Sequence, residues 1–194
     1  PPPPINIPDA VLQADDAHLG GWATSADLTS SFFQLPLKET VRPLFGFRAA
    51  GKSYVMARAP MGFTLSCPAM HAITHCLAQE AARDAKFFAY VDNVRFVGKT
   101  PEVVKGAMDR FLALCKDYSI TVNQDEAISP HETSLFLGQV TDLKQKTVKL
   151  AAKTVDKLAK WKEKCHRALS ADQVMELAGL IGWASRVLRV SLPS

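Results

Sequence analysis

The sequence of 194 residues has no apolar run near the roughly 18 residues that a membrane-spanning helix requires. Its opening, PPPPINIPDA, also lacks the basic and then apolar order of a secretory signal peptide. We therefore expect no membrane partner. The composition, 47% apolar and 22% charged, is typical of a globular protein that buries a core and excludes a wholly disordered chain.

Cysteine is scarce, and no two cysteines have the CxxC spacing of a zinc site or a redox motif. The four residues are Cys67, Cys76, Cys115 and Cys165. Their scattered positions in expected helices predict buried free thiols. Free thiols indicate an intracellular, reducing compartment, which could be the nucleus, the cytoplasm or an organelle.

Positive charge is concentrated near the C-terminus, although the net charge is only +4. Eleven lysines and arginines fall between Lys144 and Arg189. Five of them advance by 4, 3, 4 and 3 residues and so share one stripe of a helix: Lys153, Lys157, Lys160, Lys164 and Arg167. The stripe is either an ordinary solvated face or, because every charge is positive, a surface that follows a phosphate backbone.

The order of strand and helix signals predicts an α+β unit followed by a helical appendage. Residues 1–20 are rich in proline and glycine, which predicts an extended arm. β-prone runs predict strands at residues 22–27, 44–48, 53–58, 87–91, 94–98, 119–123 and 135–140. Periodicity and capping signals predict helices at residues 66–85, 101–118, 153–169 and 171–190.

Individual residues and their spacing predict two hairpin turns, the cap of the last helix and the apolar face of another helix. Gly51 supplies a positive φ between the second and third strands, and Asn93 supplies one in the link Asp92-Asn93. Ser170 and Gln173 form a capping box for the last helix. The helix from residue 101 has an apolar face of Val104, Met108, Phe111, Cys115 and Tyr118.

Two histidines, His71 and His75, are spaced to share one face of the first predicted helix. They could chelate a metal, but no HExxH glutamate lies between them and no third ligand is near in the sequence. We therefore interpret both as ordinary helix-face histidines.

The residues best suited to chemistry are Asp27 and Asp92, because each closes a predicted strand. A lone aspartate at a strand end is usually a turn or cap residue. Two-metal phosphoryl transfer, however, needs carboxylates from separate strands at one rim, since two neighbouring divalent cations repel each other. The hairpin and helix between them can lay the two strands side by side, so we expect a shared metal site.

Four segments occur in this order: DLTSSFFQLPL from Asp27, RAPMGFTLSCP from Arg58, YVDN from Tyr90 and FLG from Phe136. Together they resemble the successive palm motifs of retroelement reverse transcriptases, of the LTR or tyrosine-recombinase type. The resemblance implies a right-hand polymerase palm, an antiparallel sheet with packed helices, followed by a helical thumb and with the fingers largely missing. It implies three parts: an arm at 1–20, a palm with a finger remnant at 21–148 and a thumb at 149–194.

The resemblance also implies a function and roles for individual residues. The function is RNA-directed DNA polymerisation, in which deoxynucleotides are added to a primer with Mg²⁺ or Mn²⁺. The implied catalytic residues are Asp27, Asp92 and Asn93, with the two aspartates as metal ligands. The implied nucleotide-binding residues are Leu28, through its main-chain carbonyl, Phe32 as a steric gate against a 2′-hydroxyl, Gln34, Met61 and Gly62.

The implied partners are an RNA or DNA template–primer, a deoxynucleoside triphosphate and other subunits or further domains of the same polyprotein. Template and primer would contact the primer-grip turn and the thumb stripe, that is Phe136, Leu137, Gly138, Lys153, Lys157, Lys160, Lys164 and Arg167.

Two departures from the family pattern leave a second hypothesis open. YVDN has Asn93 where most of the family has a second aspartate, which removes one negative charge from the metal site. Asn123 is followed by Gln124, whereas the family commonly has a lysine there as a proton donor to pyrophosphate. The alternative is therefore a domesticated, catalytically inactive scaffold that binds nucleic acid or protein partners in a larger assembly.

Overall fold

The computed structural model describes residues 21–123, 129–166 and 168–190. The predicted arm at 1–20, Gln124 and Arg167 lie outside the described residues. A three-stranded antiparallel sheet of order β1-β5-β4 forms the centre. Its strands are β1 (Trp22–Asp27), β4 (Lys86–Tyr90) and β5 (Asn93–Gly98). These are close to three of the predicted strands, and they form the central sheet of the α+β unit that the sequence predicts.

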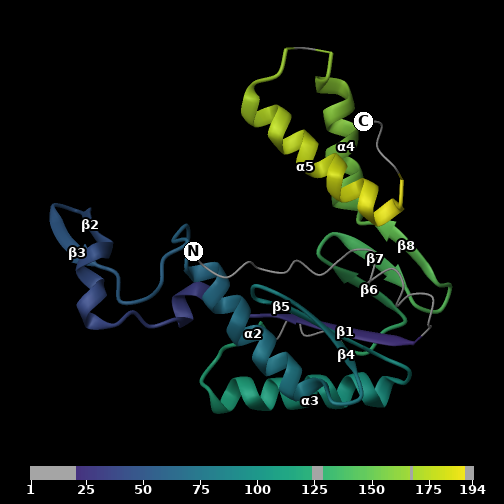
Figure 1. Cartoon of the computed structure of the whole chain (residues 1–194), viewed down its shortest axis with the longest axis horizontal. Coiled ribbons are helices and arrows are strands. Elements are labelled where there is room, and N and C mark those ends of the chain that lie inside the picture. Colours follow the sequence, from purple (N-terminus) through teal and green to yellow (C-terminus); the bar gives the residue numbers. More distant parts are fainter. Residues whose placement is uncertain (1–20, 124–128, 167, 191–194) are drawn as a thin grey trace.

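Two helices, α2 (Ser66–Ala82) and α3 (Pro101–Asp117), cover one face of this sheet (Figure 1). A second antiparallel sheet, of order β6-β7-β8, lies on the side of the first sheet that faces away from these two helices. Its strands are β6 (Thr133–Phe136), β7 (Gln139–Asp142) and β8 (Thr147–Leu150). The two sheets are joined where Ala23 and His131 exchange backbone hydrogen bonds of 2.8 and 2.9 Å.

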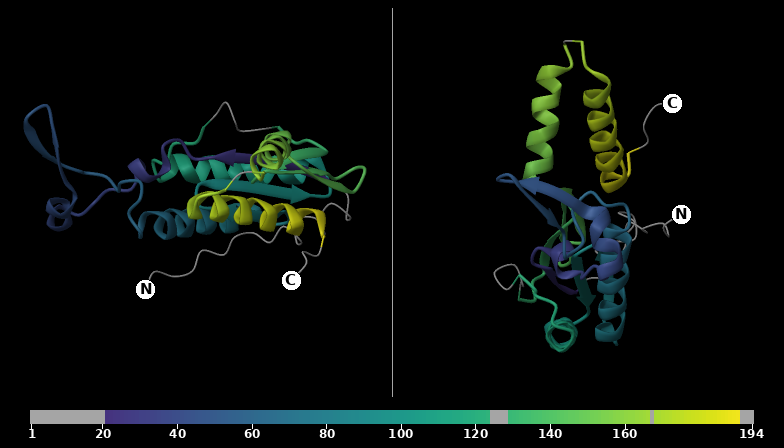
Figure 2. Two further views of the ribbon diagram at one scale, coloured as in Figure 1. Left: turned by 90° about the horizontal axis from the view of Figure 1, so that it is seen from above. Right: turned by 90° about the vertical axis from the view of Figure 1, so that its left-hand side faces the viewer.

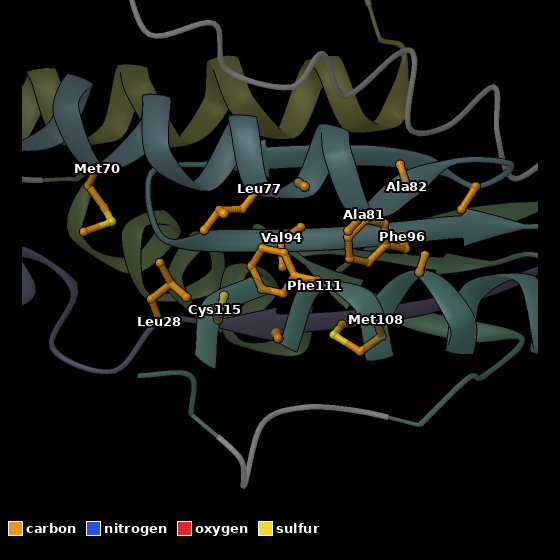
Figure 3. Packing of buried hydrophobic residues seen from close by; sticks show 14 residues of the cluster. Leu28, Met70, Leu77, Ala81, Ala82, Val94, Phe96, Met108, Phe111 and Cys115 are labelled. Atoms are coloured by element: carbon orange, nitrogen blue, oxygen red, sulfur yellow. The ribbon is translucent and has the colours of Figure 1, made fainter. Parts of the chain in front are cut away.

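The core lies between the first sheet and its two helices (Figure 3). Strand side chains alternate between faces, so Val94 and Phe96 point toward the helices while Asn93 points to the opposite face. The ring of Phe96 meets that of Phe111 edge to face, with centroids 5.9 Å apart. Small residues on α2, such as Ala78 and Ala81, are fully buried and let the helix approach closely.

The start and the lateral contacts of α3 have clear causes. Thr100 accepts a hydrogen bond from the Val103 backbone at 3.4 Å, and Pro101 occupies the first turn, as predicted. Arg110 ties α3 to α2 by donating to the Ala81 carbonyl at 2.8 Å. The prediction for Tyr118 is wrong, because the helix ends at Asp117 and the ring is largely exposed.

Residues between β1 and α2 form two short 3₁₀ helices and a projecting hairpin (Figure 1). The elements are η1 (Ser31–Gln34), η2 (Glu39–Phe45), β2 (Gly46–Ala49) and β3 (Lys52–Val55). The turn between the strands has φ of 48° at Ala50 and 73° at Gly51, which confirms the predicted positive φ. Both strands are exposed along their whole length.

Two predicted strands are wrong. Residues 119–123 contribute only an isolated bridge from Val122 to Leu28. Residues 135–140 do not run straight, because a turn at Leu137 and Gly138 divides them between β6 and β7. Sequence periodicity missed this turn, since its single glycine sits inside an otherwise apolar run.

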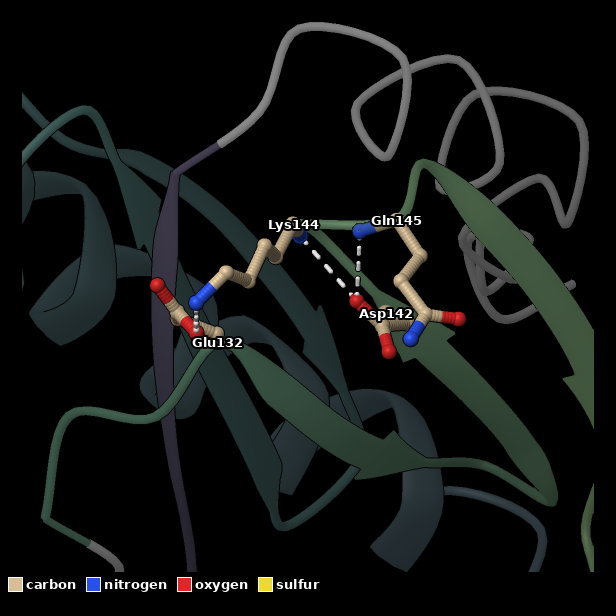
Figure 4. Close-up of polar contacts among 4 residues, drawn as sticks. All are labelled: Glu132, Asp142, Lys144 and Gln145. Carbon is tan, nitrogen blue, oxygen red and sulfur yellow. Dashed lines mark hydrogen bonds and ion pairs between the residues drawn. The ribbon is translucent and has the colours of Figure 1, made fainter.

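The turn from β7 to β8 was also not predicted, and it is stabilised by polar contacts (Figure 4). The Asp142 carboxylate accepts hydrogen bonds from the backbone N–H groups of Lys144 at 3.1 Å and Gln145 at 2.7 Å. The Lys144 ammonium reaches the Glu132 carboxylate at 3.2 Å. These contacts fold β8 back onto β7 in the absence of any glycine in the turn.

Two antiparallel helices follow β8 and stand apart from the palm (Figure 2). They are α4 (Ala152–Lys164) and α5 (Ala171–Leu188), each ending earlier than predicted. The predicted capping box is present, since Ser170 accepts from the Gln173 backbone and Gln173 accepts from the Ser170 backbone. None of the helices in the described part of the chain is long and apolar enough to cross a membrane.

The thiols are free, but only one of them is buried. Cys115 lies in the core, Cys67 is half-buried, and Cys76 and Cys165 are exposed. The prediction of buried thiols is therefore wrong for Cys76, which lies on α2, and for Cys165, which follows the last residue of α4.

Replacing Phe111 by alanine should lower the free energy of unfolding by about 3–5 kcal/mol, because it empties a fully buried ring position. Denaturant unfolding monitored by circular dichroism measures this change. The control is Phe33→Ala, whose ring is 44% exposed and whose loss should cost about 0.5 kcal/mol or less. Equal losses for the two variants would contradict the described core.

Thiol alkylation of the native protein should label Cys76 and Cys165 rapidly and leave Cys115 unmodified until the protein unfolds. Burial raises the pKa of the Cys115 thiol to about 12, so almost none of the reactive thiolate forms near neutral pH. Peptide mass spectrometry after timed quenching checks the order. Early labelling of Cys115 would show that α3 does not pack as described.

Candidate functional site

The two predicted ligands lie at the same end of the first sheet: Asp27 is the last residue of β1, and Asp92 lies in the turn between β4 and the neighbouring strand β5. In the antiparallel register Asp27 is directly opposite Asn93, so their side chains leave the sheet on the same face. Just beyond this pair, the Leu28 backbone N–H donates to the Asp92 carbonyl at 3.0 Å. The structure thus brings together the ends of the two strands that the sequence analysis singled out.

The hairpin that carries Asp92 turns one residue earlier than predicted. Tyr90 and Asn93 are paired, so the two loop residues are Val91 and Asp92. The positive φ belongs to Val91, at 55°, and Asn93 is already in β5. A β-branched residue in this conformation is an outlier that the surroundings must stabilise. The prediction that Asn93 supplies the positive φ is therefore wrong.

The Asp92 carboxylate is held by two side-chain donors. Ser31 Oγ donates to Oδ2 at 2.8 Å, and Asn93 Nδ2 donates to Oδ1 at 2.9 Å. Asn93 can donate only because it is an amide; an aspartate there would repel the neighbouring carboxylate. The two bonds fix the orientation of Asp92 and leave further lone pairs on each oxygen available.

Asp27 differs, since its Oδ1 is buried and has no hydrogen-bond partner among the described residues. A buried anionic oxygen without a donor is costly, and a bound cation would satisfy it. The donor set, carboxylate oxygens, suits Mg²⁺ or Mn²⁺. Within residues 21–123, 129–166 and 168–190, no cluster of three or more His, Cys, Asp or Glu side chains could hold a metal ion. The fit of this site to a divalent cation therefore rests on the two aspartates.

A cavity of about 520 Å³ opens beside Asp27 and connects the palm to the second sheet and the first helix of the appendage. Its lining includes Asp27, Asn93, the segment 135–138, Lys153 and Thr154. Residues distant in the sequence, with acidic, amide and basic side chains, thus face one space. Among the described residues, Lys153 and Asp27 both line the cavity and form no ion pair with each other. The two opposite charges therefore remain apart.

The predicted primer-grip residues form the β6–β7 turn. Phe136 is buried, Leu137 has φ of 49° and Gly138 has φ of 80°. The Gly138 carbonyl accepts from the Ala151 backbone N–H at 2.9 Å, which links the turn to the start of α4. A side chain at residue 138 would be strained by this φ, so glycine keeps the turn compact.

The predicted nucleotide-binding residues differ from one another in burial and in hydrogen bonding. Leu28 is buried, and Phe32 is half-buried against the core. The Gln34 amide is used within the fold: it donates to the Thr29 and Thr121 carbonyls and accepts from the Thr121 backbone at 2.7 Å. Its predicted nucleotide contact stays a prediction.

The segment before α2 presents an open surface. Met61 is 70% exposed, and Gly62 has φ of 84° with no atom within 4 Å of the position that a Cβ would occupy. The glycine therefore leaves its backbone accessible, and the nucleotide contact of Met61 and Gly62 stays a prediction.

The lysine stripe runs along α4 from the cavity outward. Lys153 lines the cavity, and Lys157, Lys160 and Lys164 are exposed farther along the helix. The buried Trp161 flanks the stripe and anchors α4, and Lys164 Nζ lies 5.4 Å from the centroid of its ring.

Sequence reasoning missed Ser31 and His71. Ser31 was hidden in the motif DLTSSFF, where only its spacing to Asp27 could have indicated a role. His71 was interpreted as an ordinary helix-face residue, yet its Nδ1 accepts a hydrogen bond from the Val91 backbone N–H at 3.2 Å. No local pattern signals this contact, because it joins residues on α2 and on the hairpin turn.

Several solved structures resemble this chain, whereas no curated protein sequence matches it significantly. The foamy viral protease-reverse transcriptase in complex with double-stranded DNA is a structural neighbour, with 19% identity, a TM-score of 0.68 and coverage of 85% of this chain and 28% of that one. The same viral protein in complex with an RNA/DNA hybrid has 19% identity, a TM-score of 0.67 and coverage of 84% and 21%.

Native prototype foamy virus protease-reverse transcriptase has 20% identity and a TM-score of 0.58, with 84% of this chain and 24% of that chain covered. This chain therefore spans less than a third of the length of these neighbours, and the likeness confirms the palm fold. Residues 2–139 match the protein family described as reverse transcriptase (RNA-dependent DNA polymerase). Because this match extends over more than half of the sequence, the chain belongs to the reverse transcriptase family.

Proposed function

We propose that this chain is the palm and thumb of an RNA-directed DNA polymerase, which adds deoxynucleotides to the 3′ end of a primer. The observation that carries the proposal is the cavity shared by Asp27, the primer-grip turn and Lys153. Family membership supports the reaction class. The structural neighbours, which bind double-stranded DNA and an RNA/DNA hybrid, support a template–primer as the partner.

Asp27 and Asp92 would hold the Mg²⁺ or Mn²⁺ ions. Divalent ions at such a site supply charge neutralisation for the triphosphate and lower the pKa of the attacking hydroxyl. Asp27 contributes the oxygen that has no described protein donor, and Asp92 contributes a carboxylate already oriented by Ser31 and Asn93. Preorganised charge of this kind reduces the reorganisation needed during reaction.

The remaining residues would bind and orient the substrates. Phe32 follows Asp27 closely in the sequence and packs on the core, so it is rigid enough to press on the sugar and reject a 2′-hydroxyl. The exposed Met61 and Gly62 would approach the incoming deoxynucleoside triphosphate. The 136–138 turn would hold the primer end, and the lysines of α4 would follow the phosphate backbone.

A scaffold without catalysis is the second candidate, and Asn93 favours it. Because Asn93 is neutral and donates to Asp92, the site has one negative charge fewer than a pair of adjacent aspartates would give. Such a chain would retain nucleic-acid binding through α4 while binding divalent cations weakly.

The Asp27→Asn variant should weaken Mn²⁺ binding by more than about tenfold, because it neutralises the carboxylate that lacks a described protein donor. Electron paramagnetic resonance titration of the chain measures this affinity, and primer extension on poly(rA) with an oligo(dT) primer should be lost in parallel. Asp109→Asn is the matched control, since Asp109 lies on α3 and pairs with Lys105.

Unchanged Mn²⁺ affinity and unchanged extension in Asp27→Asn would refute the polymerase proposal. Wild-type protein that binds a template–primer but no Mn²⁺ would instead establish the scaffold.

Replacing Lys157, Lys160 and Lys164 together by alanine should weaken template–primer binding and make it less sensitive to salt. The slope of log affinity against log salt concentration should flatten by about 0.9 for each duplex phosphate that a lysine no longer neutralises. Fluorescence anisotropy at several salt concentrations measures the slope. The matched control replaces Lys99, Lys105 and Lys116, three exposed lysines beside or on α3; equal slopes for the two triple variants would argue against α4 as the binding surface.

A further inference from the structure

One of the two residues in the turn between β4 and β5 is hydrogen-bonded to a histidine of α2. The Val91 backbone N–H donates to His71 Nδ1 at 3.2 Å, across the gap between the hairpin and α2. Nδ1 can accept only when the ring is neutral and its proton is on Nε2. His71 is half-buried, which limits competition from water for the same N–H.

The turn has a reason to need such a contact. Val91 has φ of 55°, a conformation that suits glycine and costs free energy for a β-branched residue. It persists only where the surroundings favour it over alternatives. Two contacts do so: the Val91 side chain packs against the core cluster, and its N–H is bound by His71.

Asp92 is the next residue, so the conformation of Val91 determines where the carboxylate points. The Asp92 carbonyl is bound by the Leu28 N–H at 3.0 Å, which fixes the far side of the turn to β1. A turn held at both loop residues keeps the carboxylate within reach of Ser31 and Asn93.

We propose that His71 is a positioning residue: by accepting the Val91 N–H it maintains the left-handed conformation at Val91 and thereby orients the carboxylate of Asp92. The effect on the turn is independent of any bound metal. Only its consequence for cation binding rests on the proposed function.

The neutral ring that this role requires is favoured by the surroundings. Burial lowers the pKa of His71, and the nearby His75 lowers it further. The rings of His71 and His75 are 6.0 Å apart, and His75 in turn contacts Phe87 edge to face. The acceptor is therefore available near neutral pH.

Two variants of His71 separate the acceptor from the ring, and a variant of His75 is the control. His71→Leu removes the acceptor, whereas His71→Asn restores an oxygen acceptor close to the position of Nδ1 without a ring. His75→Leu is the matched control, because His75 is exposed, lies on the same helix and makes no hydrogen bond to the turn in the described structure.

Hydrogen exchange of the Val91 amide, followed by NMR without metal, is the direct readout. His71→Leu should accelerate it by about tenfold, the change expected when one hydrogen bond is removed, and His71→Asn should recover most of the protection. The side-chain amide signal of Asn93 should shift in His71→Leu, since this amide donates to Asp92. The Phe111 amide in the core is the internal reference for global unfolding.

Unchanged Val91 exchange in His71→Leu, or His71→Asn behaving like His71→Leu, would overturn the proposal. So would equal effects of His75→Leu. Mn²⁺ titration of the same variants adds the functional arm, with His71→Leu weaker than His71→Asn. If wild-type protein binds no Mn²⁺, the proposed function fails, and Val91 exchange still decides the role of His71.

Discussion

The antiparallel register between β1 and β5 is the constraint on which the rest of the site depends. It places Asp27 opposite Asn93 and lets the Leu28 N–H reach the Asp92 carbonyl. A slip of one residue would send Asp27 to the helix-covered face, where Val94 and Phe96 are buried. The core therefore specifies the register, and the register places Asp27 opposite Asn93, the residue that follows Asp92. Stability and candidate chemistry are linked through the same pair of strands.

The two aspartates at this end of the sheet have different surroundings. Asp92 sits on a turn with an unfavourable backbone conformation and is held by Ser31 and Asn93. Asp27 lies on a regular strand and has one buried oxygen without a described donor. One carboxylate is thus oriented in advance, and the other supplies the unsatisfied negative charge. Compared with an aspartate at this position, Asn93 lacks one negative charge but provides a hydrogen-bond donor to Asp92. The donor offsets part of the effect of the lost charge, because it orients the Asp92 carboxylate.

Much of the fold and of the candidate site could be predicted from the sequence, because the patterns that indicate them are local. Asp27 and Asp92 ended periodic strands, Thr100 and Ser170 were capping residues, and the ordered motifs pointed to a reverse transcriptase palm, which the family match confirms. The failures were contacts between distant segments. The turn at Leu137 interrupts an apolar run that has the pattern of one strand.

Long-range contacts also decided the details of the site. The positive φ falls on Val91, which no propensity favours, because pairing of Tyr90 with Asn93 and the contact from His71 override the local preference. The cavity joining Asp27 to Lys153 required the fold of β6 to β8, whose last turn carries no glycine signal. A sequence shows which residues could act, while packing decides which of them face one another.

The proposed function requires that Asp27 and Asp92 form one cation site. Anomalous X-ray scattering from crystals soaked in Mn²⁺ tests it most directly, because the signal locates the ion without reference to activity. A peak is expected in contact with carboxylate oxygens of both residues. A peak elsewhere, or occupancy that involves neither aspartate, would contradict it.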